Sequence, residues 1–277
     1  MDTVLFDDIK NKVCVITGGC GILGSVFVKG LLEKGAKVAV ADYRLGDHKA
    51  GIDETGSLFY VQANVLDKES LKNAKEQINK QFGKIDLLIN GAGGNAPTAT
   101  TTNEFLKSAD KDEMLKSFFG LELDGFRSVF DLNFLGTVLP TMVFAEDMIE
   151  RGGVIINVSS MNSFRPLTKI PAYSAAKASI NNLTQWLAVH FAKVNIRVNA
   201  IAPGFFLTNQ NRFLLIDEKT GALKPRGESI IAGTPMGKFG EPEDLLGTIF
   251  YFASEASKFV TGVVIPVDGG FNAYSGV

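Results

Sequence analysis

The sequence predicts a single, doubly wound α/β domain built on a parallel, seven-stranded sheet. Short apolar runs alternate with longer helical patterns along the whole chain. The short runs are continuously apolar, as expected for strands that are covered on both faces of a sheet. Regular strand–helix alternation is typical of parallel sheets, because each parallel connection needs a crossover segment.

The first half of the chain shows this alternation clearly. KVCVIT (12–17) predicts a first buried strand, and the helical pattern 22–35 ends near a glycine, Gly35. KVAVAD (37–42) and SLFYVQAN (57–64) predict the next two strands. The following helix and the fourth strand are expected at 68–83, where Leu71, Ala74, Ile78 and Phe82 share one face, and at IDLLIN (85–90).

The second half continues in the same way. A helix is expected from about 126 to 150, and GVIINVSS (153–160) predicts the fifth strand. The remaining expected elements are a long helix at 172–194, strand six at IRVNAIAP (196–203), a helix at 241–254 and a last strand at GVVIPVDGG (262–270). No repeat or linker divides the chain, so residues 1–277 are expected to form one domain.

Two long connections interrupt the alternation, at 94–125 and 204–240. Long loops in compact domains are often functional. Both leave from the carboxyl ends of strands, where open parallel sheets bind their ligands. We therefore expect them to form the walls of a substrate site.

Composition excludes several classes of function. The net charge is −2, with 28 basic and 30 acidic residues, which gives no electrostatic reason to expect nucleic acid or an anionic membrane as a partner. Cys14 and Cys20 form no Cys-x-x-Cys pair, and His48 and His190 lack metal-ligand spacing, so no disulfide framework or metal site is expected. Free thiols, with no signal peptide or long apolar span, favour the cytoplasm.

A glycine-rich motif, TGGCGILG (17–24), follows the first strand and opens the first helix. Such glycines let the backbone turn sharply and approach a pyrophosphate, which rests on the N–H groups of the helix N-terminus. The sequence therefore predicts a dinucleotide site. Its expected residues here are Gly18, Gly19, Gly21, Ile22, Leu23 and Gly24.

The ends of the next strands complete this site. Asp42, with Tyr43 beside it, ends the second strand, where a carboxylate can bind both ribose hydroxyls and repel a 2′-phosphate. This favours NAD over NADP, although Arg44 could soften the preference. Asn64 and Val65 are expected near the adenine. The turn NGAGG is expected beside the adenosine ribose, through Asn90, Gly91, Ala92 and Gly93.

Tyr173 and Lys177 lie four residues apart in PAYSAAKAS and so share a helix face. Free tyrosine has a pKa of about 10, and a nearby ammonium favours the phenolate. We therefore expect Lys177 to lower the pKa of Tyr173. Tyr173 could then exchange a proton with an alcohol or carbonyl oxygen while a nicotinamide cofactor moves a hydride.

Taken together, TGGCGILG, NGAG, DLNFLGT, INVSS, YSAAK, APGFFLT and VDGG resemble the short-chain dehydrogenase/reductase family along nearly the whole chain. The resemblance implies a Rossmann-type fold, a homotetramer and a catalytic group of Asn133, Ser160, Tyr173 and Lys177. Ser159 is the competing serine, but the spacing from Tyr173 favours Ser160. The resemblance also implies cofactor contacts from Ile201, Pro203, Gly204 and Thr208. One departure is that Ile22 stands where many members have a glycine.

The segments NGAGGNAP, SSMNSFRPLTKIPAYSAAKA and APGFFLTNQN look like a branch described as D-mannonate oxidoreductase, or fructuronate reductase. A six-carbon sugar acid needs hydrogen-bonding groups for its hydroxyls and a cation for its carboxylate. The expected substrate residues are Asn95, Asn162, Arg165, Asn209 and Arg212, with Lys169 as a third choice of cation. The apolar tail FNAYSGV is expected to pack on a neighbouring subunit.

Two alternatives remain open from the sequence. One is a different carbonyl substrate, either a gluconate-type 5-keto acid or a 3-oxoacyl thioester, for which the apolar pairs at 118–119 and 205–206 would suit. The other is a non-catalytic NAD sensor.

Overall fold

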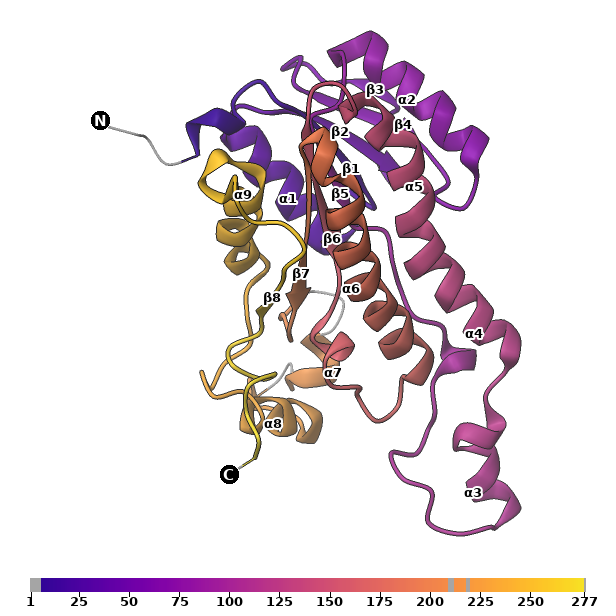
Figure 1. Cartoon of the computed structure of the whole chain (residues 1–277). Helices are drawn as coiled ribbons and strands as arrows, with labels where there is room; N and C mark the ends of the chain where they lie inside the picture. Colours follow the sequence, from indigo (N-terminus) through magenta and orange to yellow (C-terminus); the bar gives the residue numbers. More distant parts are fainter. Residues whose placement is uncertain (1–5, 209–211, 218–219, 277) are drawn as a thin grey trace.

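A single sheet of eight strands organises the residues described by the computed structural model, which are 6–208, 212–217 and 220–276 (Figure 1). The strand order is β3-β4-β2-β1-β5-β6-β7-β8, and every pair is parallel except β3–β4. The strands are β1 (Val13–Thr17), β2 (Lys37–Asp42), β3 (Gly51–Ile52), β4 (Leu58–Gln62), β5 (Leu87–Asn90), β6 (Gly153–Val158), β7 (Ile196–Pro203) and β8 (Val264–Val267). The predicted fold class and the seven parallel strands are confirmed; β3, a two-residue antiparallel edge, was not predicted.

Helices cover both faces of the sheet (Figure 1). On one face, α1 (Ile22–Glu33) and α9 (Leu246–Ala253) share a core that includes Phe27, Ile249 and Phe252. On the other face, α2 (Lys68–Phe82), α5 (Gly136–Phe144) and α6 (Pro171–Phe191) pack in a second core. Within β1, Val15 belongs to one core and Ile16 to the other. This alternation explains why the strands are apolar at every position.

The helix starts differ in a way that bears on function. At α2, the Asp67 side chain accepts hydrogen bonds from the N–H groups of Glu69 and Ser70, at 2.9 and 3.1 Å. At α1, the first residue outside the helix is Gly21, which has no side chain to cap it. Its terminal N–H groups therefore remain directed at the space beyond the sheet.

The expected 126–150 helix is a composite. It consists of α4 (Leu123–Phe130), a π-helical turn (Asp131–Leu135), α5 and a 3-10 turn (Ala145–Met148). Among the described residues, only the segment Leu123–Met148 has the length and hydropathy of a membrane span. Half of that segment is buried inside the protein, and its contacts with α2 and α6 make it a core helix.

Both long connections contain short helices that were not predicted. The 94–125 segment holds α3 (Lys111–Leu115), and the 204–240 segment holds α7 (Arg212–Leu215) and α8 (Pro225–Ala232). Figure 1 shows α3 beyond the end of α4, away from α7 and α8.

A row of buried polar side chains crosses the sheet near its carboxyl edge. Thr17, Asn90 and Asn157 are paired in register on β1, β5 and β6. The Asn90 amide donates to Asn157 Oδ1 and to Thr141 Oγ1, both at 2.9 Å, and the Asn157 amide donates to Thr184 Oγ1 at 2.9 Å. These bonds tie the central strands to α5 and α6.

Candidate active site

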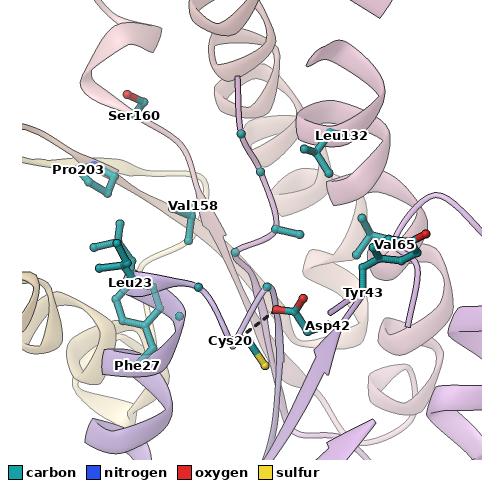
Figure 2. Close-up of a pocket in the computed structure, with 18 of the residues that line it drawn as sticks. Cys20, Leu23, Phe27, Asp42, Tyr43, Val65, Leu132, Val158, Ser160 and Pro203 are labelled. Atoms are coloured by element: carbon teal, nitrogen blue, oxygen red, sulfur yellow. Dashed lines mark hydrogen bonds between the residues drawn. The ribbon is translucent and has the colours of Figure 1, made fainter. Parts of the chain in front are cut away.

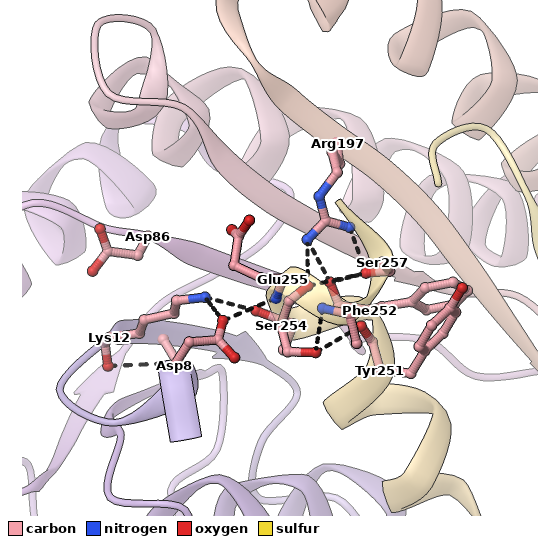
Figure 3. Close-up of polar contacts among 12 residues, drawn as sticks. Asp8, Lys12, Asp86, Arg197, Tyr251, Phe252, Ser254, Glu255 and Ser257 are labelled. Atoms are coloured by element: carbon pink, nitrogen blue, oxygen red, sulfur yellow. Dashed lines mark hydrogen bonds and ion pairs between the residues drawn. The ribbon is translucent and has the colours of Figure 1, made fainter. Parts of the chain in front are cut away.

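A cavity of about 910 Å³ opens at the carboxyl edge of the sheet (Figure 2). It lies at the centre of the sheet, where the strand order changes direction between β1 and β5. Loops that follow β1, β2, β4, β5, β6 and β7 line it. This is where ligands bind in doubly wound folds.

One end of the cavity is formed by the glycine-rich turn. Gly18 has a φ of +68°, and a Cβ there would lie 2.8 Å from the Ala92 backbone. A Cβ on Gly24 would lie 2.2 Å from the Gly18 carbonyl oxygen. Only glycine allows this turn to pack so closely against the loop after β5. Gly18, Gly21, Ile22, Leu23 and Gly24, which were expected at the dinucleotide site, all line the cavity.

Two residues predicted at this end do not line the cavity. A Cβ on Gly19 would lie 2.9 Å from the Val40 side chain, so this glycine serves the packing of the turn on β2. The Asn90 side chain is 2% exposed and belongs to the polar row within the sheet. Its hydrogen bonds direct it towards Thr141 and Asn157 and away from the cavity. Gly91 is the first residue beyond the strand edge.

Asp42 lies beside the glycine-rich turn (Figure 2). Its Oδ2 accepts a hydrogen bond from Cys20 N at 3.0 Å, and its Oδ1 accepts one from Arg44 N at 3.1 Å. The carboxylate therefore has a fixed orientation in the cavity wall. Tyr43, Asn64 and Val65, which were expected at the cofactor site, also line this end.

The other end of the cavity brings Ser160 and Tyr173 together. The Ser160 side chain lies close enough to the Tyr173 hydroxyl group to offset part of the rise in its pKa that burial causes. The neighbouring Ser159 instead donates to Asn181 Oδ1 at 2.6 Å and to the Lys177 carbonyl oxygen at 3.2 Å. The geometry favours Ser160 over Ser159 as the partner of Tyr173, because Ser159 is engaged in holding α6.

Lys177 is 4% exposed and lies beneath Tyr173. Its Nζ donates to the Val158 carbonyl oxygen at 2.8 Å and lies 5.6 Å from the centre of the Tyr173 ring. Burial lowers the pKa of Lys177 to about 8. The ammonium form is thus still the main one at neutral pH.

The protein's own groups do not lower the pKa of Tyr173, contrary to the expectation from the sequence. Burial raises the pKa of Tyr173, and the Ser160 side chain offsets this only in part. The residue packs against an apolar cluster that contains Ala99, Val129 and Ala172. At neutral pH the phenol is therefore protonated.

Asn133 lies within the π-helical turn and is fully buried. Its Nδ2 donates to the carbonyl oxygens of Gly94 at 2.7 Å and Val129 at 2.8 Å, and its Oδ1 accepts from Gly94 N at 3.3 Å. A Cβ on Gly93 would lie 2.7 Å from Asn133 Oδ1 and 3.3 Å from Lys177 Nζ. Asn133 therefore fixes the loop after β5 close to Lys177, without itself lining the cavity.

The loop after β7 closes the cavity. Pro203, Gly204 and Thr208, which the resemblance implied as cofactor contacts, line it. Ile201 does not, because its side chain is in the core and its carbonyl oxygen accepts a hydrogen bond from Ser159 N at 2.8 Å.

None of the substrate residues proposed from the sequence lines the cavity, as far as the structure describes them. Asn95 donates to Thr100 Oγ1 at 2.9 Å, Asn162 is buried, and Arg165 and Arg212 are exposed. Asn209 lies outside the described residues. Of the 94–125 segment, only Gly94 lines the cavity, and the role of the segment as a substrate wall stays a prediction.

Several lining residues lie outside the predicted cofactor and catalytic sets, although Arg44, Ser159, Phe205 and Phe206 were considered as alternatives. They are Cys20, Phe27, Ala41, Arg44, Ala63, Leu66, Gly94, Leu132, Val158, Ser159, Phe205 and Phe206. Most lie at or next to a strand end or beside a predicted motif residue. That position is the signal that could have identified them.

Comparisons with known proteins agree with this geometry. The family model for short chain dehydrogenases matches residues 12–219. An uncharacterized oxidoreductase of Bacillus subtilis (strain 168) is 50% identical over 279 residues, which is 99% of each chain. A 2-dehydro-3-deoxy-D-gluconate 5-dehydrogenase of Formosa agariphila is 33% identical over 290 residues, covering 100% of this chain and 98% of the relative.

A solved structure shows the same fold with a nucleotide. It is a provisionally assigned D-mannonate oxidoreductase from Haemophilus influenza with bound NAD, at 47% identity and a TM-score of 0.88. The match covers 98% of this chain and 99% of that one.

Proposed function

The chain belongs to the short-chain dehydrogenase family, and from that premise we propose that it is an NAD-dependent oxidoreductase that interconverts D-fructuronate and D-mannonate. One observation carries the oxidoreductase chemistry. The neighbouring side chains of Ser160 and Tyr173 lie with Lys177 at one end of a cavity whose other end holds a glycine-rich turn and Asp42.

The residues present fit NAD. The close packing of Gly18 and Gly24 leaves a cradle for a pyrophosphate at the uncapped start of α1. Asp42 would hold the adenosine ribose hydroxyls and repel the 2′-phosphate of NADP. Tyr173, Lys177 and the loop Pro203–Gly204–Thr208 would hold the nicotinamide half. When bound, NAD(H) supplies or accepts the hydride.

The protein's own groups manage the proton. Because burial raises the pKa of Tyr173, the phenol is protonated and can donate to a carbonyl oxygen that is being reduced. Ser160 binds that same oxygen and orients it. The Lys177 ammonium stabilises the phenolate that remains, and Asn133 holds the loop that packs beside Lys177.

A hexonate with its reacting oxygen on C5 is the favoured substrate class. D-mannonate is such a compound, and both the Haemophilus structure and the Formosa relative carry descriptions of six-carbon sugar-acid chemistry. The second candidate is therefore a gluconate-type 5-keto acid. Phe205 and Phe206 give the cavity an apolar wall, which keeps a 3-oxoacyl thioester as a further alternative.

We also propose a cytoplasmic homotetramer. Both cysteines are free thiols, which suits a reducing compartment. Met142 on α5 and Trp186 and Val189 on α6 are 55%, 58% and 80% exposed, and such apolar helix faces favour subunit contacts. Light scattering after gel filtration would report the subunit number.

An NADH absorbance assay tests the activity. The wild type is offered D-fructuronate, 5-keto-D-gluconate and acetoacetyl thioesters, and we expect reduction of D-fructuronate with the highest kcat/KM. Tyr173→Phe should lose turnover by about 10²- to 10⁴-fold while NADH binding, read by fluorescence, survives. Activity on the thioester alone would overturn the sugar-acid assignment, and inactivity on every carbonyl would favour the NAD sensor.

A further inference from the structure

The C-terminal tail, residues 268–276, is folded onto its own chain. Asp268 follows β8 and accepts hydrogen bonds from Gly270 N at 3.0 Å and Asn272 N at 2.8 Å. Tyr274 N donates to the Gly270 carbonyl oxygen at 3.1 Å. These hydrogen bonds are made within the tail itself, and its packing on a neighbouring subunit stays a prediction.

These contacts reach segments that surround the cavity. The Phe271 ring packs edge-on against Phe205, a cavity-lining residue, with ring centres 5.3 Å apart. The Gly269 carbonyl oxygen accepts a hydrogen bond from Met236 N at 3.1 Å, which joins the tail to the loop after α8. The tail therefore connects the cavity-lining residue Phe205 with the loop after α8.

The third contact is with Arg165. This residue follows the 3-10 turn Met161–Ser163, which begins directly after Ser160. Arg165 Nη1 donates to the Tyr274 carbonyl oxygen. Its other guanidinium N–H groups have no protein acceptor among the described residues, and no carboxylate there pairs with it.

The Tyr274 carbonyl group holds the Arg165 guanidinium in place but, being neutral, does not neutralise its positive charge. With no carboxylate partner among the described residues, Arg165 can bind an anion. Arginine binds carboxylates through two parallel N–H groups, and Nε and Nη2 of Arg165 are available for this. The cations that line the cavity itself are weaker candidates. Lys177 is buried beneath Tyr173, and Arg44 lies at the Asp42 end of the cavity.

We propose that Arg165 binds the carboxylate of the sugar acid and that the tail positions it through the Tyr274 carbonyl group. This deepens the proposed function and rests on it. The tail is a positioning element: it restricts the rotamers of a long side chain before substrate arrives, so less conformational entropy is lost on binding.

Three variants test the proposal: Arg165→Met, a chain truncated after Ala273 and the two combined. The substrate pair is D-fructuronate and D-fructose, which differ by a carboxylate in place of a hydroxymethyl group. Arg127→Met, an exposed arginine paired with Asp124 on α4, is the matched control. Circular dichroism and NADH fluorescence check the fold and the cofactor site of each variant.

We expect Arg165→Met to raise KM for D-fructuronate by about 10- to 100-fold, as for loss of a charged hydrogen-bonded contact, with kcat and NADH affinity unchanged. The truncation should raise KM by about 3- to 10-fold, and the combined variant should be no worse than Arg165→Met. Turnover of D-fructose should respond to none of these changes.

Two results would overturn the inference. One is an unchanged KM for D-fructuronate in Arg165→Met; the other is multiplication of the two single effects in the combined variant, since the tail would then act without Arg165. Neither outcome touches the proposed function, which fails only if the wild type does not reduce D-fructuronate.

Discussion

Replacing Lys177 with methionine should abolish most activity and yet stabilise the protein. The substitution removes an ammonium that is buried beneath Tyr173, while it keeps a side chain of similar length. Burial lowers the pKa of Lys177 from 10.5 to about 8, which corresponds to about 3 kcal/mol of unfavourable free energy at pH 7. Loss of the hydrogen bond to the Val158 carbonyl oxygen costs about 1 kcal/mol, so we expect a net stabilisation of about 2 kcal/mol.

The stability difference between the wild type and Lys177→Met should depend on pH in a defined direction. Between pH 8 and pH 10.5 the unfolded chain holds the Lys177 proton and the folded protein releases it. The free energy of unfolding of the wild type therefore rises with pH over this window, relative to the variant. By pH 10 the gap between the two proteins should shrink by about 2 kcal/mol.

Urea unfolding at pH 7 and pH 10, followed by the fluorescence of Trp186, measures both quantities. Lys193→Met, at an exposed lysine in the turn after α6, is the control and should show no such gap. If Lys177→Met is less stable than the wild type at pH 7, or if the gap is the same at both pH values, the ammonium is not desolvated as inferred.

The other predictions concern single contacts in the site. Ser160→Ala should lower kcat about 100-fold or more, whereas Ser159→Ala should lower stability by about 1 kcal/mol with less than a tenfold effect on kcat; the reverse pattern would exchange their roles. Asp42→Ala should reduce the preference for NADH over NADPH at least about tenfold in kcat/KM, and unchanged selectivity would mean that another group reads the 2′ position. Gly93→Ala should lower kcat about tenfold or more, because the new methyl group lies 2.7 Å from Asn133 Oδ1; normal turnover would show that this loop adapts freely.

Local patterns were enough to predict the sheet and the catalytic end of the cavity. The spacing of Tyr173 and Lys177 is a property of one helix, and the glycine-rich turn is a property of one strand–helix junction. Both features can therefore be predicted from the sequence, and both are present in the structure. Ser160 was also predictable, because it follows closely after β6, whose last residue, Val158, lines the cavity.

Other features depend on neighbours that are distant in the sequence. Asn90 and Gly91 are adjacent, but only the pairing of β5 with β6 determines that the first faces the sheet interior. The contact of Arg165 with Tyr274 spans 109 residues and follows no local pattern. The raised pKa of Tyr173 likewise depends on how completely α6 and its neighbours bury the phenol.

The polar row across the sheet has a consequence for how the chain reaches its native state. A slip of one position in the pairing of β5 with β6 would turn Asn90 and Asn157 towards the opposite layer and leave buried amides without partners. Each buried amide without a hydrogen-bond partner would destabilise the misaligned sheet by about 1–3 kcal/mol. Valine or isoleucine at these positions would carry no such penalty and would tolerate either alignment. The polar row thus disfavours misaligned folding intermediates of β5 and β6, two strands whose carboxyl ends lie beside the cavity.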